Sequence, residues 1–82
     1  MTFTVYSKRL CPYCDKIKQV LEHISVIKAY PVVIYELDTH FNRDDFYAEF
    51  GEGSTFPQVV YQDKHLGGCS DTIKYLQEHN ML

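Results

Sequence analysis

The chain has 82 residues, a formal net charge of −3 and a hydrophobic content of 45%, so one small folded domain over residues 1–82 is expected. The negative charge and the lack of a run of lysine and arginine argue against nucleic-acid binding. The first ten residues lack the apolar run of a signal peptide, and no apolar stretch could cross a membrane. We therefore expect a soluble, cytoplasmic protein.

Residues 2–7, TFTVYS, alternate and are rich in strand-forming residues, so a strand is expected there. Apolar residues then recur with the spacing of one helix face at Ile17, Val20, Leu21 and Ile24. Proline is favoured at a first helical position, where its missing N–H costs nothing. The helix is therefore expected to begin at about Pro12, with Cys11 as its N-cap and Cys14 on the same side.

Residues 32–37, VVIYEL, form a near-continuous apolar run, which is typical of a strand buried on both faces. The strand, helix and strand together predict a right-handed unit, with Cys11 and Cys14 at the carboxyl end of the first strand. A helix is then expected at 43–50, a loop at 51–54, a strand at 57–62, an edge strand at 65–68 and a final helix at 70–80. Ser70 and Asp71 are expected to cap the last helix.

Cysteines in the sequence CPYC, residues 11–14, allow three interpretations. A zinc site usually needs four closely spaced ligands, and the chain's histidines form no paired motif with the distant Cys69. A structural disulfide would close a very small loop in a reducing compartment. Redox chemistry is the favoured interpretation, and metal binding and a structural disulfide remain the alternatives.

The expected position of Cys11 supplies a chemical reason for redox activity. A thiolate at a helix N-terminus is stabilised by free backbone N–H groups and by the helix dipole, so the pKa of Cys11 should fall and its nucleophilicity rise. Lys8 and Arg9 add positive charge nearby. Cys14, which should be less exposed, is placed to attack next as the resolving thiol.

Three motifs, YSKRLCPYC, TFPQVV and GGCSDT, follow one another along the chain. Together they closely resemble a small glutaredoxin of the dithiol type over nearly the whole length. The resemblance implies an α/β, thioredoxin-like fold with a four-stranded mixed sheet flanked by three helices in the order β-α-β-α-β-β-α. It also implies a thiol–disulfide oxidoreductase that uses glutathione as co-substrate, without a metal or a tightly bound cofactor.

The resemblance also implies roles for individual residues. Cys11 would be the nucleophile and Cys14 the resolving thiol, and Pro57 would be cis. Glutathione contacts would come from Lys8, Tyr13, Thr55, Phe56, Pro57, Cys69, Ser70 and Asp71.

Each end of glutathione would meet its own group. The N–H groups of Cys69 and Ser70 would hold the γ-glutamyl carboxylate, Asp71 the ammonium group, and Lys8 the glycyl carboxylate. The Cys69 side chain itself is expected to be a small buried packing residue.

One departure concerns the second helix, where many relatives carry an arginine or glutamine that also meets the glycyl carboxylate. This chain has Asp44 there, with Arg43 one residue earlier. Either Arg43 takes over the contact or the contact is missing.

The implied reaction is the reduction of protein disulfides and protein–glutathione mixed disulfides by a monomer, with ribonucleotide reductase among the possible electron acceptors. Two alternative functions remain. A related oxidoreductase fed by thioredoxin reductase would usually lack Lys8 and the GGCSD motif. A module holding an iron–sulfur cluster between two chains would usually lack a proline at the position of Pro12.

Overall fold

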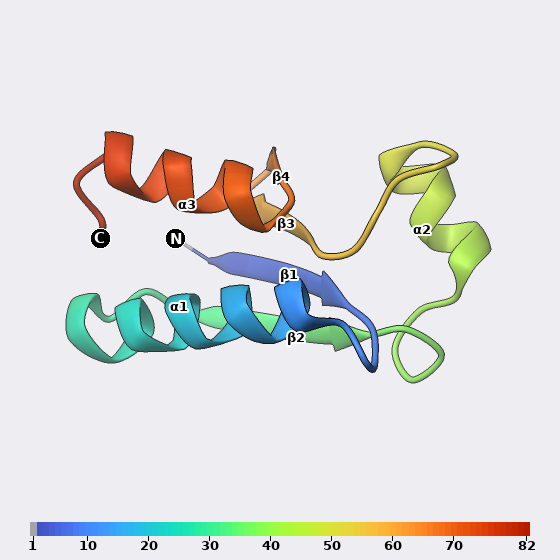
Figure 1. Cartoon of the computed structure of the whole chain (residues 1–82), viewed down its shortest axis with the longest axis horizontal. Coiled ribbons are helices and arrows are strands. Elements are labelled where there is room, and N and C mark those ends of the chain that lie inside the picture. The colour runs from blue at the N-terminus through green and yellow to red at the C-terminus, as the bar shows by residue number, and fades with distance from the viewer. Residues whose placement is uncertain (1) are drawn as a thin grey trace.

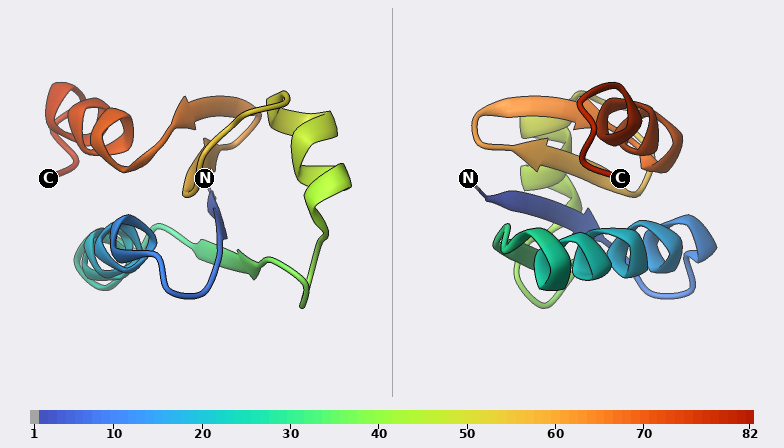
Figure 2. Two further views of the ribbon diagram at one scale, coloured as in Figure 1. Left: turned by 45° about the vertical axis from the view of Figure 1, so that its right-hand side comes forward. Right: turned by 90° about the vertical axis from the view of Figure 1, so that its left-hand side faces the viewer.

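The computed structural model describes residues 2–82, which form a four-stranded sheet and three helices (Figure 1). In chain order, the elements are β1 (Phe3–Ser7), α1 (Pro12–Lys28), β2 (Val32–Glu36), α2 (Arg43–Phe50), β3 (Gln58–Tyr61), β4 (Lys64–Gly67) and α3 (Cys69–Glu78). Helices α1 and α3 lie on one face of the sheet, and α2 lies on the other side (Figure 2). The predicted thioredoxin-like fold and its element order are confirmed.

The order of strands in the sheet is β2-β1-β3-β4. β1 runs parallel to β2, with Tyr6 opposite Tyr35, and antiparallel to β3, with Tyr6 opposite Gln58. β4 pairs antiparallel with β3. Because β1 and β3 run in opposite directions, the chain leaving β1 and the chain entering β3 meet at one end of the sheet. This end carries Cys11 and Phe56.

The core lies between the sheet and the helices α1 and α3. Phe3 and Val5 of β1 are fully buried. The buried stripe of α1 consists of Cys14, Ile17, Leu21 and Ile24. Val20, which the helical spacing placed on the same face, packs at the border of the core and is only partly buried. Burying an aliphatic side chain of this size contributes about 1.5–3 kcal/mol, so this stripe fixes α1, and with it the cysteines, on the sheet.

The prediction for β2 was wrong in one respect, because this strand is not buried on both faces. It lies at an edge of the sheet, and Val33 and Tyr35 remain 36% and 37% exposed. An edge strand has one neighbouring strand instead of two, and no helix covers its outward-facing side chains completely. The apolar run at residues 32–37 therefore reflects the β-propensity of its residues and does not indicate that the strand is fully buried.

The capping of α3 also differs from the prediction. The helix begins at Cys69, its N-cap is Gly68, and no side chain accepts a capping hydrogen bond. Ser70 and Asp71 therefore lie inside the first turn and are not caps. Asp71 still places its negative charge at the positive end of the helix dipole.

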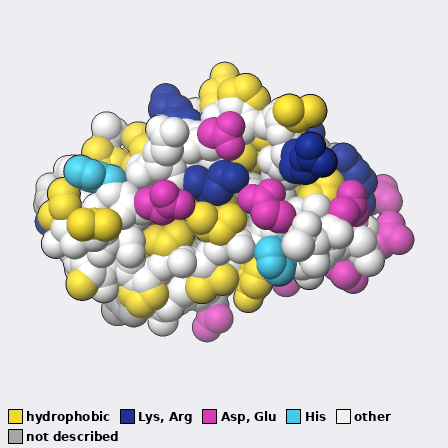
Figure 3. Space-filling model, turned by 90° about the horizontal axis from the view of Figure 1, so that it is seen from below, with side chains coloured by type: hydrophobic (Ala, Val, Ile, Leu, Met, Phe, Trp, Pro, Cys, Tyr) yellow, Lys and Arg dark blue, Asp and Glu magenta, His cyan; other side chains and the backbone are white. Residues whose placement is uncertain are grey.

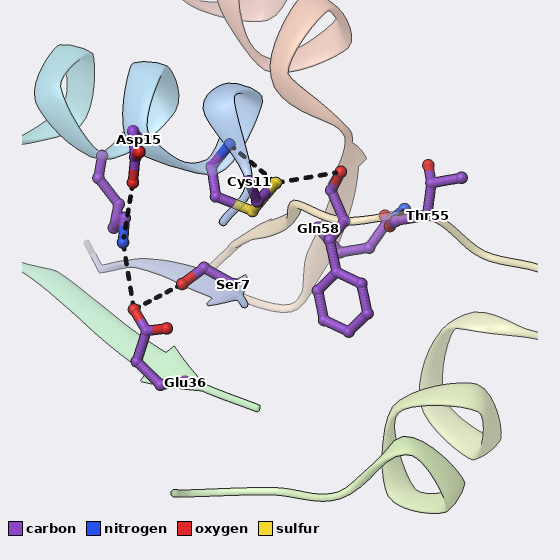
Figure 4. The surroundings of a disulfide bond; sticks show 9 residues. Ser7, Cys11, Asp15, Glu36, Thr55 and Gln58 are labelled. Atoms are coloured by element: carbon purple, nitrogen blue, oxygen red, sulfur yellow. Dashed lines mark hydrogen bonds and ion pairs between the residues drawn. A yellow bond between two sulfur atoms is a disulfide. The ribbon is translucent and has the colours of Figure 1, made fainter. Parts of the chain in front are cut away.

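A polar contact ties β1, α1 and β2 together beneath the cysteines (Figure 4). The hydroxyl of Ser7 donates to Oε1 of Glu36 at 2.7 Å, and the ammonium group of Lys18 donates to the same oxygen at 3.2 Å. Burial alone would raise the pKa of Glu36. The two hydrogen bonds, the charge of Lys18 and a contribution from His40 outweigh burial, so the pKa of Glu36 lies below its usual value.

Replacing Glu36 with glutamine keeps the shape of the side chain and removes its charge. We expect this change to lower the free energy of unfolding by about 1 kcal/mol at pH 7. Because the folded-state pKa is depressed, the charge stabilises the fold above the unfolded pKa of about 4.3 and its contribution is lost as the pH falls through the folded pKa. Urea unfolding at pH 7 and at pH 3 measures the difference. An equal loss at both pH values would contradict the charge as its cause.

Candidate active site

Cys11 and Cys14 lie at the start of α1, as the sequence predicted. Cys11 is the N-cap, Pro12 occupies the first helical position, and the backbone N–H of Cys14 donates to Sγ of Cys11 at 3.2 Å. The two cysteines are joined by a disulfide, with their Cα atoms 5.2 Å apart. Cys14 is fully buried whereas Cys11 retains 6% exposure. An incoming group therefore reaches the sulfur of Cys11 first.

The chain entering β3, which carries Phe56 between the labelled Thr55 and Gln58, faces this disulfide (Figure 4). The carbonyl oxygen of Phe56 lies 3.9 Å from Sγ of Cys11, and the Phe56–Pro57 bond is cis, as predicted. In the disulfide the sulfur of Cys11 carries no proton, so its approach to the Phe56 carbonyl is a contact and not a hydrogen bond. In the reduced protein a Cys11 thiol at the same place has this carbonyl as a hydrogen-bond acceptor.

A groove of about 290 Å³ opens beside the disulfide. It is lined by Tyr13, Thr55, Phe56, Gln58, Gly67, Gly68, Cys69, Ser70 and Asp71. The structure thus brings together six of the residues predicted to contact glutathione, although their roles stay predictions. Gln58 was missed; its side-chain amide donates to the carbonyl of Thr55 at 2.9 Å.

The first turn of α3 forms one wall of the groove. Backbone N–H groups at a helix start have no partner within the helix and favour a negatively charged ligand. Gly67, just before the helix, has a φ of 104°, and a Cβ at this position would come within 2.7 Å of a carboxylate oxygen of Asp71. Glycine here therefore lets the turn pass close to the Asp71 carboxylate.

Two cations lie on the ring of Phe56. The ammonium group of Lys8 is 5.6 Å from the ring centroid, and the guanidinium of Arg43 is 5.8 Å from it. Such distances fit a cation–π interaction. The structure therefore places Lys8 and Arg43 near the same ring, and the contact of Arg43 with the glycyl carboxylate stays a prediction.

Apolar side chains next to the nucleophile are exposed. Leu10, immediately before Cys11, is 96% exposed and Tyr13 is 63% exposed. Leu10 also has a positive φ of 55°, which turns the chain outward at this point. Exposed apolar groups of this size favour contact with another macromolecule. The sequence motif did not single out Leu10.

The third cysteine, Cys69, is buried in the main core cluster, as predicted. Burial raises the pKa of its thiol, and the positive charge of Lys16 offsets only part of this effect. Cys69 therefore favours the neutral thiol, which is a poor nucleophile.

Another hollow lies away from the cysteines. It measures about 460 Å³ and runs between the C-terminal half of α1 and residues Met81 and Leu82. Among residues 2–82, no cluster of three or more histidine, cysteine or acidic side chains is placed to hold a metal ion. In the same residues, no helix is long and apolar enough to span a membrane.

Comparison with known proteins identifies the family. The glutaredoxin family model matches residues 3–66. A glutaredoxin of Ricinus communis is 38% identical over 77 residues, covering 89% of this chain and 72% of that protein. Glutaredoxin 1 of Rickettsia prowazekii is 32% identical over 77 residues, which cover 94% of this chain and 79% of that protein. The chain belongs to the glutaredoxin family.

Solved structures agree on the fold of this glutaredoxin. The solution structure of reduced Escherichia coli glutaredoxin superposes with a TM-score of 0.85 over the full length of both chains, at 20% identity. A buckwheat glutaredoxin in complex with glutathione superposes with a TM-score of 0.71 at 24% identity, covering 96% of this chain and 71% of that one. Glutaredoxins are thiol–disulfide oxidoreductases, and this chain is an enzyme of that class.

Alkylation of the reduced enzyme tests the difference between its cysteines. Cys11 and Cys69 are equally exposed, at 6% each, so exposure alone would make them react alike. We expect iodoacetamide at pH 7 to modify Cys11 first, because its sulfur accepts the Cys14 N–H whereas burial raises the pKa of Cys69. Peptide mass spectrometry over a time course gives both rates. Modification of Cys69 at the rate of Cys11 would contradict the assignment.

Proposed function

We propose that this glutaredoxin uses glutathione to reduce protein disulfides and protein–glutathione mixed disulfides. The observation that carries the proposal is the contact between Sγ of Cys11 and the backbone of Phe56, the residue that also lines the groove ending at α3. A substrate sulfur bound in that groove would lie next to Cys11. The rest of a bound peptide extends from there along Phe56 toward Ser70.

In the dithiol reaction the Cys11 thiolate attacks one sulfur of a protein disulfide, and the other protein sulfur leaves as a thiol. Cys14 then attacks the mixed disulfide. This step releases the reduced protein and forms the Cys11–Cys14 disulfide, so two electrons have passed from the enzyme's dithiol to the substrate disulfide. Two molecules of glutathione restore the dithiol and leave as one glutathione disulfide.

In the second reaction the substrate is a protein–glutathione mixed disulfide. Cys11 attacks the sulfur of glutathione, and the protein leaves as a thiol. A second glutathione attacks the Cys11–glutathione disulfide and regenerates Cys11 as glutathione disulfide departs. This sequence does not use Cys14.

Glutathione fits the groove by charge as well as by position. Its γ-glutamyl carboxylate would meet the N–H groups of Cys69 and Ser70 at the start of α3, and Asp71 would receive the ammonium group. The glycyl carboxylate would meet Lys8 and Arg43 beside Phe56. A buckwheat glutaredoxin of the same fold was solved in complex with glutathione, which supports glutathione as the ligand.

The remaining contacts proposed are those of Tyr13, Thr55 and Pro57, which lie around the bound peptide. Protein substrates would rest on the exposed side chains of Leu10 and Tyr13. We propose that residues 1–82 act as one glutaredoxin domain, a monomer without a tightly bound cofactor, in a cytoplasmic, reducing compartment. Ribonucleotide reductase is a candidate electron acceptor, suggested by the family resemblance.

Two serine substitutions separate the two reactions. Cys11→Ser should abolish both, because Cys69, although it lies at the start of α3, is buried and the pKa of its thiol is raised. Cys14→Ser should keep glutathione-dependent reduction of a small mixed disulfide and lose most reduction of protein disulfides, since only Cys14 can open the mixed disulfide from within. Both activities are measured with glutathione, glutathione reductase and NADPH. If Cys14→Ser loses both activities equally while thioredoxin reductase supports the wild type, glutathione is not the reductant.

Reversing the charge at position 8 tests the carboxylate contact. Lys8→Glu should raise the KM for glutathione about tenfold, which corresponds to about 1.4 kcal/mol, because an attraction becomes a repulsion. Lys74→Glu makes the same change of charge at an exposed position of α3 outside the groove, and it should leave the KM within about twofold, as for most surface substitutions. Similar KM values for the two variants would show that Lys8 does not contact the carboxylate of glutathione.

A further inference from the structure

A second hollow, of about 260 Å³, lies on the α2 side of the sheet and takes no part in the reaction described above. It is lined by Tyr6, Tyr35, His40, Phe41, Asp45, Phe46, Glu49 and Phe50. These residues come from β1, β2, α2 and the segment before α2. Because side chains alternate along a strand, Tyr6 points to the face opposite that of the buried Val5.

Aromatic rings form the walls of this hollow. The ring centroid of Tyr6 lies 5.5 Å from Tyr35, 5.3 Å from Phe41 and 5.0 Å from Phe50. The planes of these three rings are inclined to that of Tyr6 by 51°, 74° and 67°, respectively. These rings pack against one another edge to face or at a tilt, and together they line the hollow. Because the face of an aromatic ring attracts cations, a hollow lined by several rings suits the positively charged end of a side chain.

The charged groups of the lining are negative. Asp45 and Glu49 are one turn apart on α2 and both are exposed. The lining includes no lysine or arginine. Nδ1 of His40 accepts the backbone N–H of Glu36 at 3.0 Å, so this nitrogen carries no proton while that bond is made.

The charge of Glu49 affects the pKa of Tyr6, which also lines the hollow. The pKa of Tyr6 is raised, first by burial and then by the charges of Glu49 and Tyr35. Glu49 also pairs through Oε2 with Nε2 of His65 at 2.9 Å. His65 therefore competes with a cationic ligand for this carboxylate.

The hollow shares a wall with the active site. Phe46 stacks on Phe56 with centroids 4.1 Å apart and planes inclined by 12°, and the carbonyl of Phe56 meets Cys11. Lys8 and Arg43 lie close to the same Phe56 ring. Figure 3 shows basic and acidic side chains close together at the end of the molecule where α2 lies. A polypeptide that crosses Phe56 therefore meets both basic and acidic groups.

We propose that this aromatic and acidic hollow binds the ammonium group of a lysine side chain on the protein substrate, and that the enzyme therefore favours disulfides with a lysine a few residues away. Its volume of about 260 Å³ can hold a single lysine side chain. The formal net charge of −3 also favours basic partners. This proposal rests on the proposed reduction of protein disulfides.

Binding is tested first without any redox chemistry. The oxidised protein is titrated at pH 8 with N-acetyl-lysine amide and, separately, with N-acetyl-norleucine amide, which lacks the charge, and the aromatic NMR signals are followed. The lysine compound should shift the ring signals of Tyr6, Tyr35 and Phe50, and the norleucine compound should not. Shifts of equal size with both compounds, or none with either, would overturn the proposal.

Turnover is tested with two peptides that carry the same disulfide and differ only by lysine or norleucine near it. The wild type should favour the lysine peptide about fivefold in kcat/KM, the size of a cation–π contact with added charge. Asp45→Asn combined with Glu49→Gln should bring the ratio close to one. Asp63→Asn combined with Glu78→Gln removes the same charge from exposed positions outside the hollow, and it should keep the wild-type ratio.

The two tests separate failure of this proposal from failure of the proposed function. Ring shifts without turnover of either peptide would leave the hollow in place and contradict glutathione-dependent disulfide reduction. Turnover of both peptides at equal rates by the wild type would support the reaction and overturn the lysine preference. An equal fall of the ratio in both double variants would assign the preference to net charge and overturn the local site.

Discussion

The backbone N–H of Cys14 donating to the sulfur of Cys11 is the interaction on which the rest of the site depends. It exists because Cys11 caps α1 and Pro12 starts the helix. The buried stripe of α1 holds this helix on the sheet, and Glu36 joins Ser7 to Lys18 just beneath the first turns. The sheet thus positions a sulfur where backbone donors stabilise its negative charge, while its partner sulfur is kept out of solvent.

Phe56 contacts both the sulfur of Cys11 and the charged and aromatic side chains around the site. Its carbonyl meets Cys11, its ring lies near Lys8 and Arg43, and the same ring stacks on Phe46 of α2. The ring of Phe56 therefore lies close to two cations suited to a carboxylate and, through Phe46, adjoins the aromatic, acidic hollow that we propose for an ammonium group. The site thus offers one charge preference for glutathione and another for a protein substrate.

Local sequence rules predicted the features that depend on neighbouring residues. The cap at Cys11, the buried side of α1 and the order of elements follow from proline chemistry and periodicity. The edge position of β2 depends on pairing with β1 alone, and an apolar run does not report how many strands flank it. The start of α3 at Cys69 was missed because Ser70 and Asp71 are good capping residues in isolation. The hollow next to Tyr6 arises from rings far apart in the sequence, and no local pattern marks it.

The most direct test of the account is to find where glutathione becomes attached and what it then touches. Cys14→Ser is incubated with glutathione disulfide, the adduct is located by peptide mass spectrometry, and its structure is determined. The account predicts a single glutathione on Cys11, lying along Phe56 with its γ-glutamyl carboxylate at the start of α3 and its glycyl carboxylate near Lys8 and Arg43. Glutathione attached to Cys69, or attached to Cys11 but directed away from Ser70, would contradict it.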